Sequence, residues 1–247
     1  MAFAVWSPPA TAPRYRSGAF CGIDTIHNPS GDGDFHISHS CAKFRTMDAK
    51  TQKSELTRAA IVGAALDLAA AEGLESITLQ AVADRVGLSK SGVFSRAGSR
   101  EALQKAVIEE FGRRFLADVF VPAMQHPKGL PRLNEIVRRW IARTRDVEAF
   151  TGCIYTAGAF ELDDREGELR DLLHSEITRW RAALRRTVLQ AIEAGHLPAD
   201  TPQEQLVGEI YSMIMGLLHD VRFLRDPQAV PRTEASWARL VKSYQTA

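Results

Sequence analysis

The hydrophobic pattern from Ser76 to Leu103 predicts two short helices separated by a tight turn. Thr78 is a suitable N-cap for the first helix and Ser89 for the second, and Gly87 breaks the pattern between them. The apolar positions of the two helices are Leu79, Val82, Ala83, Val86, Val93 and Phe94. Two short helices joined in this way form a helix-turn-helix, whose second helix commonly lies in the major groove of DNA.

The outer surface of the second helix is polar and cationic, which is the chemistry that base edges and phosphates require. It carries Ser89, Lys90, Ser91, Ser95 and Arg96. Five Lys or Arg and one acid lie between Arg85 and Lys105, although the net charge of the whole chain is only +1. This local positive charge favours binding to duplex DNA. The spacing alone leaves open the alternative of ordinary amphipathic helices in an all-α protein.

The rest of the chain has helical periodicity and no strand-like alternation of useful length. Helices are expected over residues 100–119, 131–141, 153–162, 169–192, 203–224 and 233–244. The adjacent acids Asp163 and Asp164 are expected to form a solvated turn and to cap the helix over 169–192. Together with a helix before the helix-turn-helix, the pattern predicts an all-α protein of about nine helices.

The segment 203–224 is apolar around most of its helical circumference. Its apolar positions are Leu206, Val207, Ile210, Tyr211, Met213, Ile214, Met215, Leu217, Leu218 and Val221. A surface helix needs one apolar stripe, so this helix must be covered on more than one side. The cover is either a partner subunit or, in a monomer, other helices of the same chain. We favour a homodimer, because helix-turn-helix proteins read two-fold half-sites as dimers.

The composition is that of a globular protein with one or two domains: 247 residues, 45% hydrophobic and 25% charged. No apolar run approaches the roughly 18 residues of a membrane span. The N-terminus lacks the basic start and apolar core of a signal peptide, and Pro8, Pro9 and Pro13 interrupt it. We therefore expect a cytoplasmic protein that does not associate with membranes.

Residues 1–46 contain several Pro and Gly and have no helical period. We expect a disordered extension here, and Met47 is a candidate for the natural start of translation. An alternative is a metal site at His36, His39 and Cys41, but their spacing matches no common zinc module. Three cysteines provide no disulfide framework. We expect neither a metal nor a cofactor.

Several fixed motifs accompany the two short helices. A preceding amphipathic helix ends in Ala-Glu-Gly, a short link leads to Thr78, the run Val-Gly-Leu-Ser-Lys follows, and Gly-Ser-Arg-Glu-Ala-Leu opens a fourth helix. With these motifs, residues 51–105 resemble the DNA-binding domain of the tetracycline-repressor (TetR/AcrR) family of bacterial regulators. The resemblance implies that Thr78, Lys90 and Arg100 contact or approach backbone phosphates. It also places five residues at or near the groove: Ser89, Ser91, Gly92, Ser95 and Arg96.

The chain departs from the family pattern at three positions. Phe94 stands where the family usually has Tyr, whose hydroxyl often bonds phosphate, and Ala97 stands where it usually has Phe. Gly92 is displaced by one position. Phe94 is still expected at the DNA interface, although it cannot donate the usual hydrogen bond. The departures affect the expected docking and operator sequence and leave the expected fold unchanged.

The same resemblance implies a division into a DNA-binding domain over residues 50–105 and a ligand-binding and dimerisation domain over 106–247. It implies that the last two helices pair with those of a partner, through Tyr211, Met215, Leu218, Trp237 and Leu240. It also implies a ligand cavity between the fourth and eighth helices. Its candidate lining residues are Phe115, Trp140, Phe150, Cys153, Tyr155, Phe160, Trp180, Met213 and His219. Most of these side chains are better explained as ordinary core positions than as a cavity wall.

The sequence therefore predicts a dimeric transcriptional repressor that a small apolar or aromatic molecule releases from a palindromic operator in double-stranded DNA. An architectural DNA-binding dimer without a ligand is the alternative, although dimerisation alone would not require so large a C-terminal part. An α-helical enzyme is the third hypothesis. The run Gly-Leu-Ser-Lys-Ser-Gly around Ser89 lacks the second glycine of a nucleophile elbow and no strand precedes it. No catalytic residue is predicted.

Overall fold

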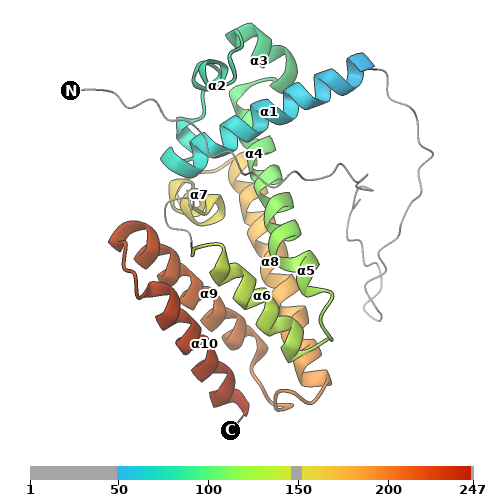
Figure 1. Ribbon diagram of the computed structural model, residues 1–247, viewed down its shortest axis with the longest axis vertical. Helices are drawn as coiled ribbons and strands as arrows, with labels where there is room; N and C mark the ends of the chain where they lie inside the picture. Colours follow the sequence, from blue (N-terminus) through green and yellow to red (C-terminus); the bar gives the residue numbers. More distant parts are fainter. Residues whose placement is uncertain (1–48, 146–151, 246–247) are drawn as a thin grey trace, which may run out of the picture. The chain divides into compact units, whose positions relative to one another are not determined.

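The computed structural model describes residues 49–145 and 152–245. Within these ranges the chain is all-helical, with nine α-helices of eight or more residues and no strand (Figure 1). The predicted fold class is therefore confirmed. The predicted extension over residues 1–46 and the pocket candidate Phe150 lie outside the described residues.

The first three helices are α1 (Ala49–Glu72), α2 (Leu79–Val86) and α3 (Lys90–Ala97). The Thr78 hydroxyl accepts a hydrogen bond from the backbone N–H of Ala81 at 3.0 Å, which caps α2. Gly87 ends α2 in the left-handed region at φ 67°, a conformation that side chains with a Cβ disfavour. The Ser89 hydroxyl then caps α3. Local capping chemistry thus sets the boundaries that the sequence pattern predicted.

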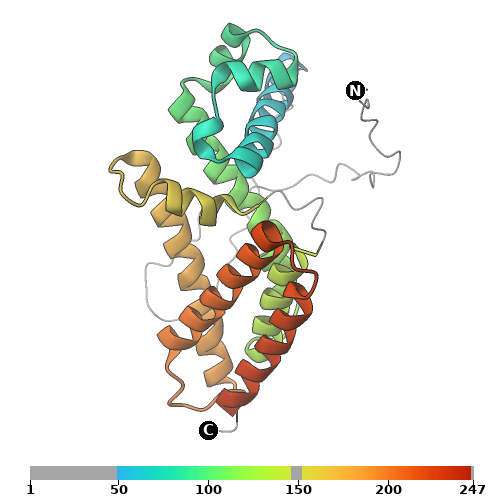
Figure 2. The same ribbon diagram turned by 90° about the vertical axis from the view of Figure 1, so that its left-hand side faces the viewer.

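The fourth helix is a long rod that joins the N-terminal helices to the rest of the bundle (Figure 2). It consists of α4 (Arg100–Phe115), a π-helical turn over Leu116–Phe120 and α5 (Val121–Ala123). The buried side chains Leu103, Val107 and Ile108 line its apolar face, and α4 packs along α1. One continuous helix therefore belongs to both the N-terminal core and the C-terminal core.

The C-terminal helices are α6 (Leu130–Ala142), α7 (Ile154–Glu161), α8 (Glu168–Glu193), α9 (Gln203–His219) and α10 (Ala229–Gln245). A π-helical turn over Asp220–Leu224 extends α9. Helix α8 packs against α4, α6, α7 and α9, and α10 packs against α9 and α6. Together these helices enclose the C-terminal core.

Two predicted boundaries differ from the structure. Helix α10 begins at Ala229 rather than near residue 233, because Pro231 lies in its first turn, where a missing backbone N–H is tolerated. The N-cap of α8 is Gly167, without a side-chain cap, so the expectation that Asp163 and Asp164 cap this helix is wrong. The Asp163 carboxylate instead accepts from the backbone N–H of Asp164 within an exposed turn. In the described ranges, no helix combines the length and apolar character needed to cross a bilayer.

Candidate nucleic-acid interface and cavity

Helix α3 presents a polar surface because Val93 holds its opposite side in the core. Val93 is fully buried, whereas Lys90, Ser91 and Arg96 are exposed. Phe94 is 57% exposed, which is unusual for an aromatic side chain. At 3.6 residues per turn, Ser91 and Ser95, each two positions from Val93, lie on the opposite side of α3, whereas Lys90 and Arg96, each three positions away, flank the buried side. The arrangement fits insertion of α3 into a groove.

Some of the predicted contact residues are held by hydrogen bonds within α3. The Ser89 hydroxyl accepts from the backbone N–H of Gly92 at 3.1 Å and lies 3.1 Å from the Ser91 hydroxyl. Ser95 Oγ and Arg96 Nη1 both donate to the Gly92 carbonyl, at 3.0 and 2.9 Å. In the free chain this bond engages Nη1 of the exposed Arg96 guanidinium.

Arg100 braces the link between α1 and α2. Its Nε donates to the Ile77 carbonyl at 2.7 Å, and its Nη2 donates to the carbonyl and the carboxylate of Glu75, both at 2.8 Å. Arg100, together with Arg165, holds the pKa of the Glu75 carboxyl below its usual value. In the free chain Arg100 therefore has a structural role, and a phosphate could reach only the exposed part of its guanidinium.

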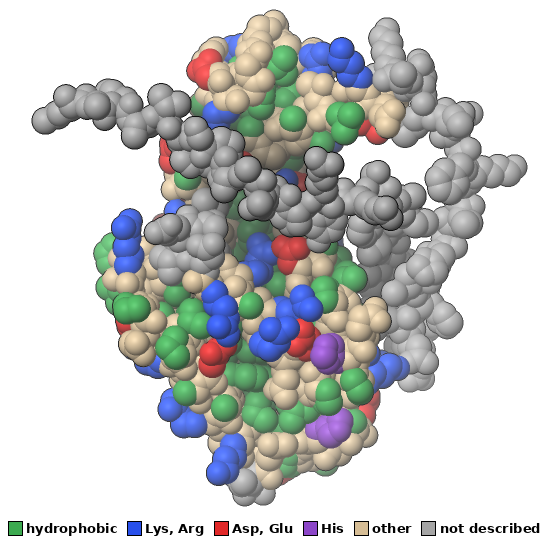
Figure 3. Space-filling view, in the orientation of Figure 1, with side chains coloured by type: hydrophobic (Ala, Val, Ile, Leu, Met, Phe, Trp, Pro, Cys, Tyr) green, Lys and Arg blue, Asp and Glu red, His purple; other side chains and the backbone are tan. Residues whose placement is uncertain are grey.

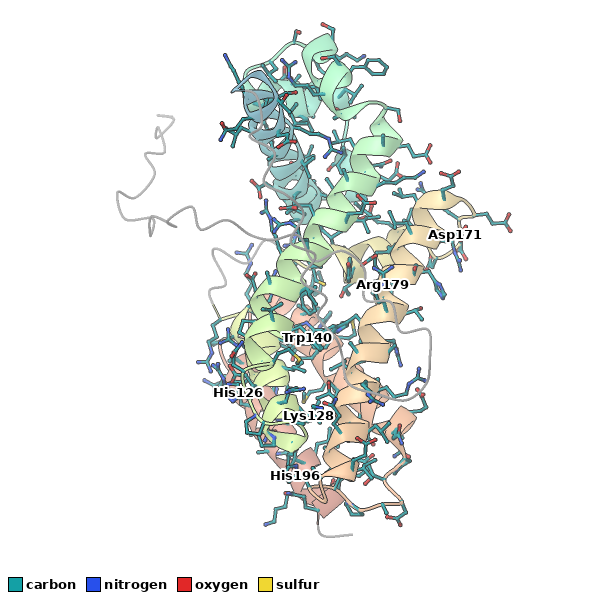
Figure 4. The ribbon with its side chains drawn as sticks, turned by 90° about the vertical axis from the view of Figure 1, so that its right-hand side faces the viewer. His126, Lys128, Trp140, Asp171, Arg179 and His196 are labelled. Atoms are coloured by element: carbon teal, nitrogen blue, oxygen red, sulfur yellow. The ribbon has the colours of Figure 1, made fainter. Side chains whose placement is uncertain are left out.

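A cavity of about 150 Å³ lies among α4, α6, α7, α8 and α9. Its lining residues are Phe111, Phe115, Trp140, Cys153, Tyr155, Thr156, Ala159, Phe160, Ile177, Trp180, Tyr211 and Met215. Trp140, which belongs to α6, lies between α4 and α8 (Figure 4). Aromatic rings meeting at steep angles form much of the wall, including Phe115 and Trp180 at 89° with ring centroids 4.7 Å apart.

The cavity contains six of the nine predicted pocket residues. These are Phe115, Trp140, Cys153, Tyr155, Phe160 and Trp180. Met213 packs against the core and does not line the cavity, and His219 is exposed beside Asp220 and Phe223, so these two predictions are corrected. Among the lining residues that the sequence analysis missed, Phe111 precedes Phe115 by one helical turn. Because side chains four positions apart share one face of a helix, this spacing could have predicted that Phe111 lines the cavity beside Phe115.

The residues predicted for the dimer interface lie against the chain's own core. Tyr211 and Met215 line the cavity, and the Tyr211 ring lies 5.4 Å from the Trp140 ring. Leu218 and Trp237 are each 8% exposed, and Leu240 packs partly buried against the core. The Trp237 indole N–H also donates to Asn134 Oδ1 at 3.0 Å. The periodicity correctly identified apolar positions but could not distinguish the chain's own helices from a partner's.

Two side chains connect the cavity region with the link between α1 and α2. Glu161, the last residue of α7, accepts from the backbone N–H groups of Leu74 and Glu75, both at 3.2 Å. Gly73 has φ 92°, a conformation that residues with a Cβ disfavour, and a Cβ there would also lie 2.6 Å from Glu161 Oε1. These contacts join residues 86 and 87 positions apart in the sequence, and no sequence motif predicted them.

Arg222 makes the second connection, from the π-helical turn that follows α9. Its Nη2 donates to the carbonyls of Ala70 and Ala71 at 2.9 and 3.1 Å. These carbonyls belong to the last turn of α1, where helical carbonyls lack intrahelical partners and favour a cation. We refer to Glu161 and Arg222 together as the clamp. The clamp holds both sides of the turn between α1 and α2.

Comparisons with known proteins agree with this arrangement. Residues 61–107 match the family described as "Bacterial regulatory proteins, tetR family", and residues 129–237 match "Tetracyclin repressor-like, C-terminal domain". Together the two matches cover more than half of the chain. No curated protein sequence matches.

Solved structures share the fold at low sequence identity. A TetR-family transcriptional regulator from Cytophaga hutchinsonii is 18% identical with a TM-score of 0.68, over 79% of this chain and 98% of that one. A TetR transcriptional regulator from Chloroflexus aurantiacus is 20% identical with a TM-score of 0.66, over 77% and 95%. The ketosteroid transcriptional regulator KstR2 of Mycobacterium tuberculosis is 17% identical with a TM-score of 0.57, over 76% and 94%.

Regulators of this family act by binding DNA and are not enzymes. A capped helix-turn-helix, an exposed polar α3 and matches to both the N-terminal and the C-terminal family descriptions occur together in this chain. The chain therefore belongs to the TetR family of bacterial regulatory proteins and is a DNA-binding transcriptional regulator.

Proposed function

We propose that this regulator is a homodimeric cytoplasmic repressor that binds a palindromic operator through α3 and is released by a small molecule in the C-terminal cavity. The observation that carries the proposal is the coexistence of an exposed polar α3 with a partly open aromatic cavity in one helical chain. The division into a DNA-binding part over residues 50–105 and an effector and dimer part over 106–247 belongs to this proposal. The two separate family matches support the division.

At the DNA, we assign base and groove contacts to Ser91, Ser95 and Arg96 and a phosphate contact to Lys90. Lys90, Ser91 and Ser95 are exposed on the same helix. The Ser89 and Thr78 hydroxyl oxygens already accept a capping hydrogen bond from the backbone. A contact of either hydroxyl with DNA would therefore be made in addition to its capping bond. Phe94 contributes an apolar contact at the groove wall, and Gly92 allows the backbone of α3 to approach DNA closely.

For the dimer, we assign the interface to the exposed side of α9 instead of its core-facing residues. Gly208, Ser212 and Gly216 follow one another at a spacing of four, which places them on one helical face. A Cβ added to either glycine would meet nothing within 4 Å, so this face is open in the single chain. Phe223 is 77% exposed just beyond it. Hydrophobic side chains are scattered over the face that includes α9 and α10 (Figure 3).

For effector release, we propose that the clamp transmits changes at the cavity to the helix-turn-helix. Helix α7 contributes Tyr155, Thr156, Ala159 and Phe160 to the cavity and ends in Glu161. Helix α9 contributes Tyr211 and Met215, and its π-helical extension contains Arg222. A ligand that prefers a different position of α7 or α9 must weaken the DNA-competent arrangement reciprocally.

The experiment that tests DNA recognition begins with selection of the operator from a random DNA pool. We expect Lys90→Ala to weaken binding by about tenfold and to reduce the salt dependence by roughly one phosphate contact. The matched control is Lys128→Ala, in the loop before α6 and remote from α3 (Figure 4). Fluorescence anisotropy over a salt series measures both. Equal loss in the two variants would contradict the assignment of α3 as the reading helix.

Effector release is tested by adding small molecules to the operator complex. A compound that binds the free protein must lower operator affinity if it prefers the DNA-incompetent state. Melting shifts against a metabolite collection identify such compounds. An architectural DNA binder without a ligand would show no compound that both raises the melting temperature and lowers operator affinity.

A further inference from the structure

The described part of the cavity wall carries no charged side chain. Among its lining residues within 49–145 and 152–245, none is Asp, Glu, Lys, Arg or His. Two polar atoms of the lining residues have partners: Tyr155 Oη donates to Glu176 at 3.1 Å, and Thr156 Oγ1 donates to Met215 Sδ at 3.5 Å. The indole N–H of Trp180, another lining residue, is buried without a hydrogen-bond partner among the described residues, so a neutral acceptor is the one polar group that it could satisfy. A charged ligand would lose its hydration here without gaining an ion pair, which is strongly unfavourable.

Two arginines of the described part of the chain stack on rings of the wall and do not line the cavity. The Arg143 guanidinium lies 5.5 Å from the Phe115 ring centroid, and the Arg181 guanidinium lies 4.6 Å from that of Tyr211. Each stacks on a ring whose side chain lines the cavity, in the geometry of a cation–π contact. Arg143 is also paired with Asp118. These arginines therefore support the aromatic wall and leave its inner surface neutral.

The size of the cavity limits the ligand further. Pockets for drug-sized ligands measure roughly 300–1,000 Å³. This cavity measures about 150 Å³. Apolar protein cavities of about 150 Å³ stay dry and take up benzene. A four-ring skeleton or a long acyl chain does not fit unless the core rearranges.

The ring geometry favours an aromatic occupant. Phe115, Trp140 and Trp180 meet pairwise at 76°, 80° and 89°, with centroid separations from 4.7 to 5.5 Å. Such a wall presents both ring faces and ring edges to the cavity. A planar aromatic ligand can then stack on one ring and meet another edge-on, the two arrangements that aromatic pairs prefer.

Among the described lining residues, an opening of the cavity toward solvent lies at α7. Phe160 lines the cavity and is nevertheless 74% exposed, and Ala159 beside it is also exposed. A side chain that faces both the cavity and solvent marks the place where the two meet. A ligand therefore enters beside Phe160 and Ala159.

We propose that this cavity binds a neutral, single-ring aromatic compound of about ten non-hydrogen atoms. The inference rests on the proposed role of the cavity as the effector site. The inferred ligand class depends only on the uncharged described wall, the volume of the cavity and the geometry of its rings. Binding to the cavity can therefore be measured without DNA.

The experiment compares methyl benzoate with benzoate at pH 7.5, by calorimetry on the full-length chain. The two probes share the ring and differ mainly in charge. We expect methyl benzoate to bind with one site per chain and benzoate to bind at least tenfold more weakly. Progesterone, a neutral four-ring compound, tests the size limit and is expected not to bind.

A mouth-blocking variant identifies the site of binding. Ala159→Trp should abolish methyl benzoate binding, and its matched control Ala157→Trp should not. Ala157 is exposed on the same helix and does not line the cavity. Because both positions are exposed, both variants are expected to fold, which circular dichroism and thermal melting verify.

The outcomes separate this inference from the proposed function. Benzoate binding as tight as methyl benzoate binding, preference for progesterone, or no binding of methyl benzoate at about 1 mM overturns the inference. Unchanged binding in Ala159→Trp also overturns it. If methyl benzoate binds as expected but leaves operator affinity unchanged, the ligand class stands and the proposed release mechanism fails. If other compounds release the operator while methyl benzoate does not bind, the proposed release mechanism stands and the inferred ligand class fails.

Discussion

Phe94 of α3 stands at a position where the TetR family usually has Tyr. Its ring is 57% exposed on α3, between residues that point toward the expected groove. An exposed ring without a polar atom gives an apolar contact but no hydrogen bond to phosphate. The fold tolerates this because Val93, rather than Phe94, anchors α3 in the core.

Phe94→Tyr is therefore expected to strengthen operator binding by about fivefold, because the added hydroxyl can donate to a phosphate oxygen. The free energy of unfolding should stay within about 0.5 kcal/mol, since the ring is exposed. Phe94→Leu is the matched control, because it changes the same exposed side chain without adding a hydroxyl. Binding to the selected operator is measured by anisotropy. A similar gain in both variants would show that the hydroxyl is not responsible.

Among the helices, α6 contains a buried acid that depends on its own neighbours. The Glu135 carboxylate accepts from Arg138 at 2.6 and 2.7 Å and from Arg139 at 2.6 Å. Hydrogen bonds from these guanidinium groups lower the pKa of Glu135 from its ordinary value of 4.5 to about 2, although burial opposes the shift. The carboxylate form is therefore stabilised by folding.

A lowered pKa predicts that this stabilisation is present above pH 4.5 and is lost as the pH falls toward about 2. Glu135→Gln should lower the free energy of unfolding at pH 7 by on the order of 2 kcal/mol, after allowance for the solvent-exposed partners. The difference from the wild type should shrink between pH 4.5 and 2. Urea unfolding over that range measures it, with the exposed Glu109→Gln as control. A difference that does not change with pH would contradict the role of the ion pair.

The turn between α1 and α2 depends on a helix that lies far away in the sequence. Glu161→Ala removes the acceptor of the Leu74 and Glu75 amides. Hydrogen bonds to a charged group are worth roughly 1.5–3 kcal/mol, so the exchange of these two amides should accelerate by about tenfold. Hydrogen-exchange mass spectrometry or NMR reports the change. Glu166→Ala, in the exposed segment before α8, should leave these amides unchanged. Equal exchange in wild type and Glu161→Ala would show that the carboxylate does not hold the turn.

For the assembled protein, the exposed side of α9 is the proposed dimer surface. Gly208 and Gly216 leave open space, and Ser212 lies between them. Small residues at this spacing let two helices approach closely, and a cation there would be buried without a partner. The same surface would set the separation between the two copies of α3, so dimerisation and operator binding should fail together.

Ser212→Arg is accordingly expected to give monomers by multi-angle light scattering and to weaken operator binding by at least tenfold. Ser175→Arg, on the exposed side of α8, is the control and should leave the mass unchanged. The two variants add the same charge. If Ser212→Arg remains a dimer, the exposed side of α9 is not the dimer interface and another surface must form it.

The boundaries of α2 and α3 could be predicted from the sequence, because the caps Thr78 and Ser89 and the left-handed Gly87 act on atoms within a few residues. The helical class of the C-terminal part could be predicted for the same reason, since periodicity is a local property. The prediction that Asp163 and Asp164 cap α8 was wrong, because a helix start without a side-chain cap has no distinctive composition.

The sequence alone thus established the family, the bounds of the proposed reading helix α3 and the apolar side of each long helix, all of which depend on neighbouring residues. It could not specify what each apolar side packs against. Tyr211 and Met215 line a cavity in the chain's own core, and Glu161 and Arg222 reach α1 and the turn after it across 86 to 152 positions of sequence. The reason is physical: periodicity shows that a side chain is removed from water, and the packing of distant helices decides which atoms replace the water.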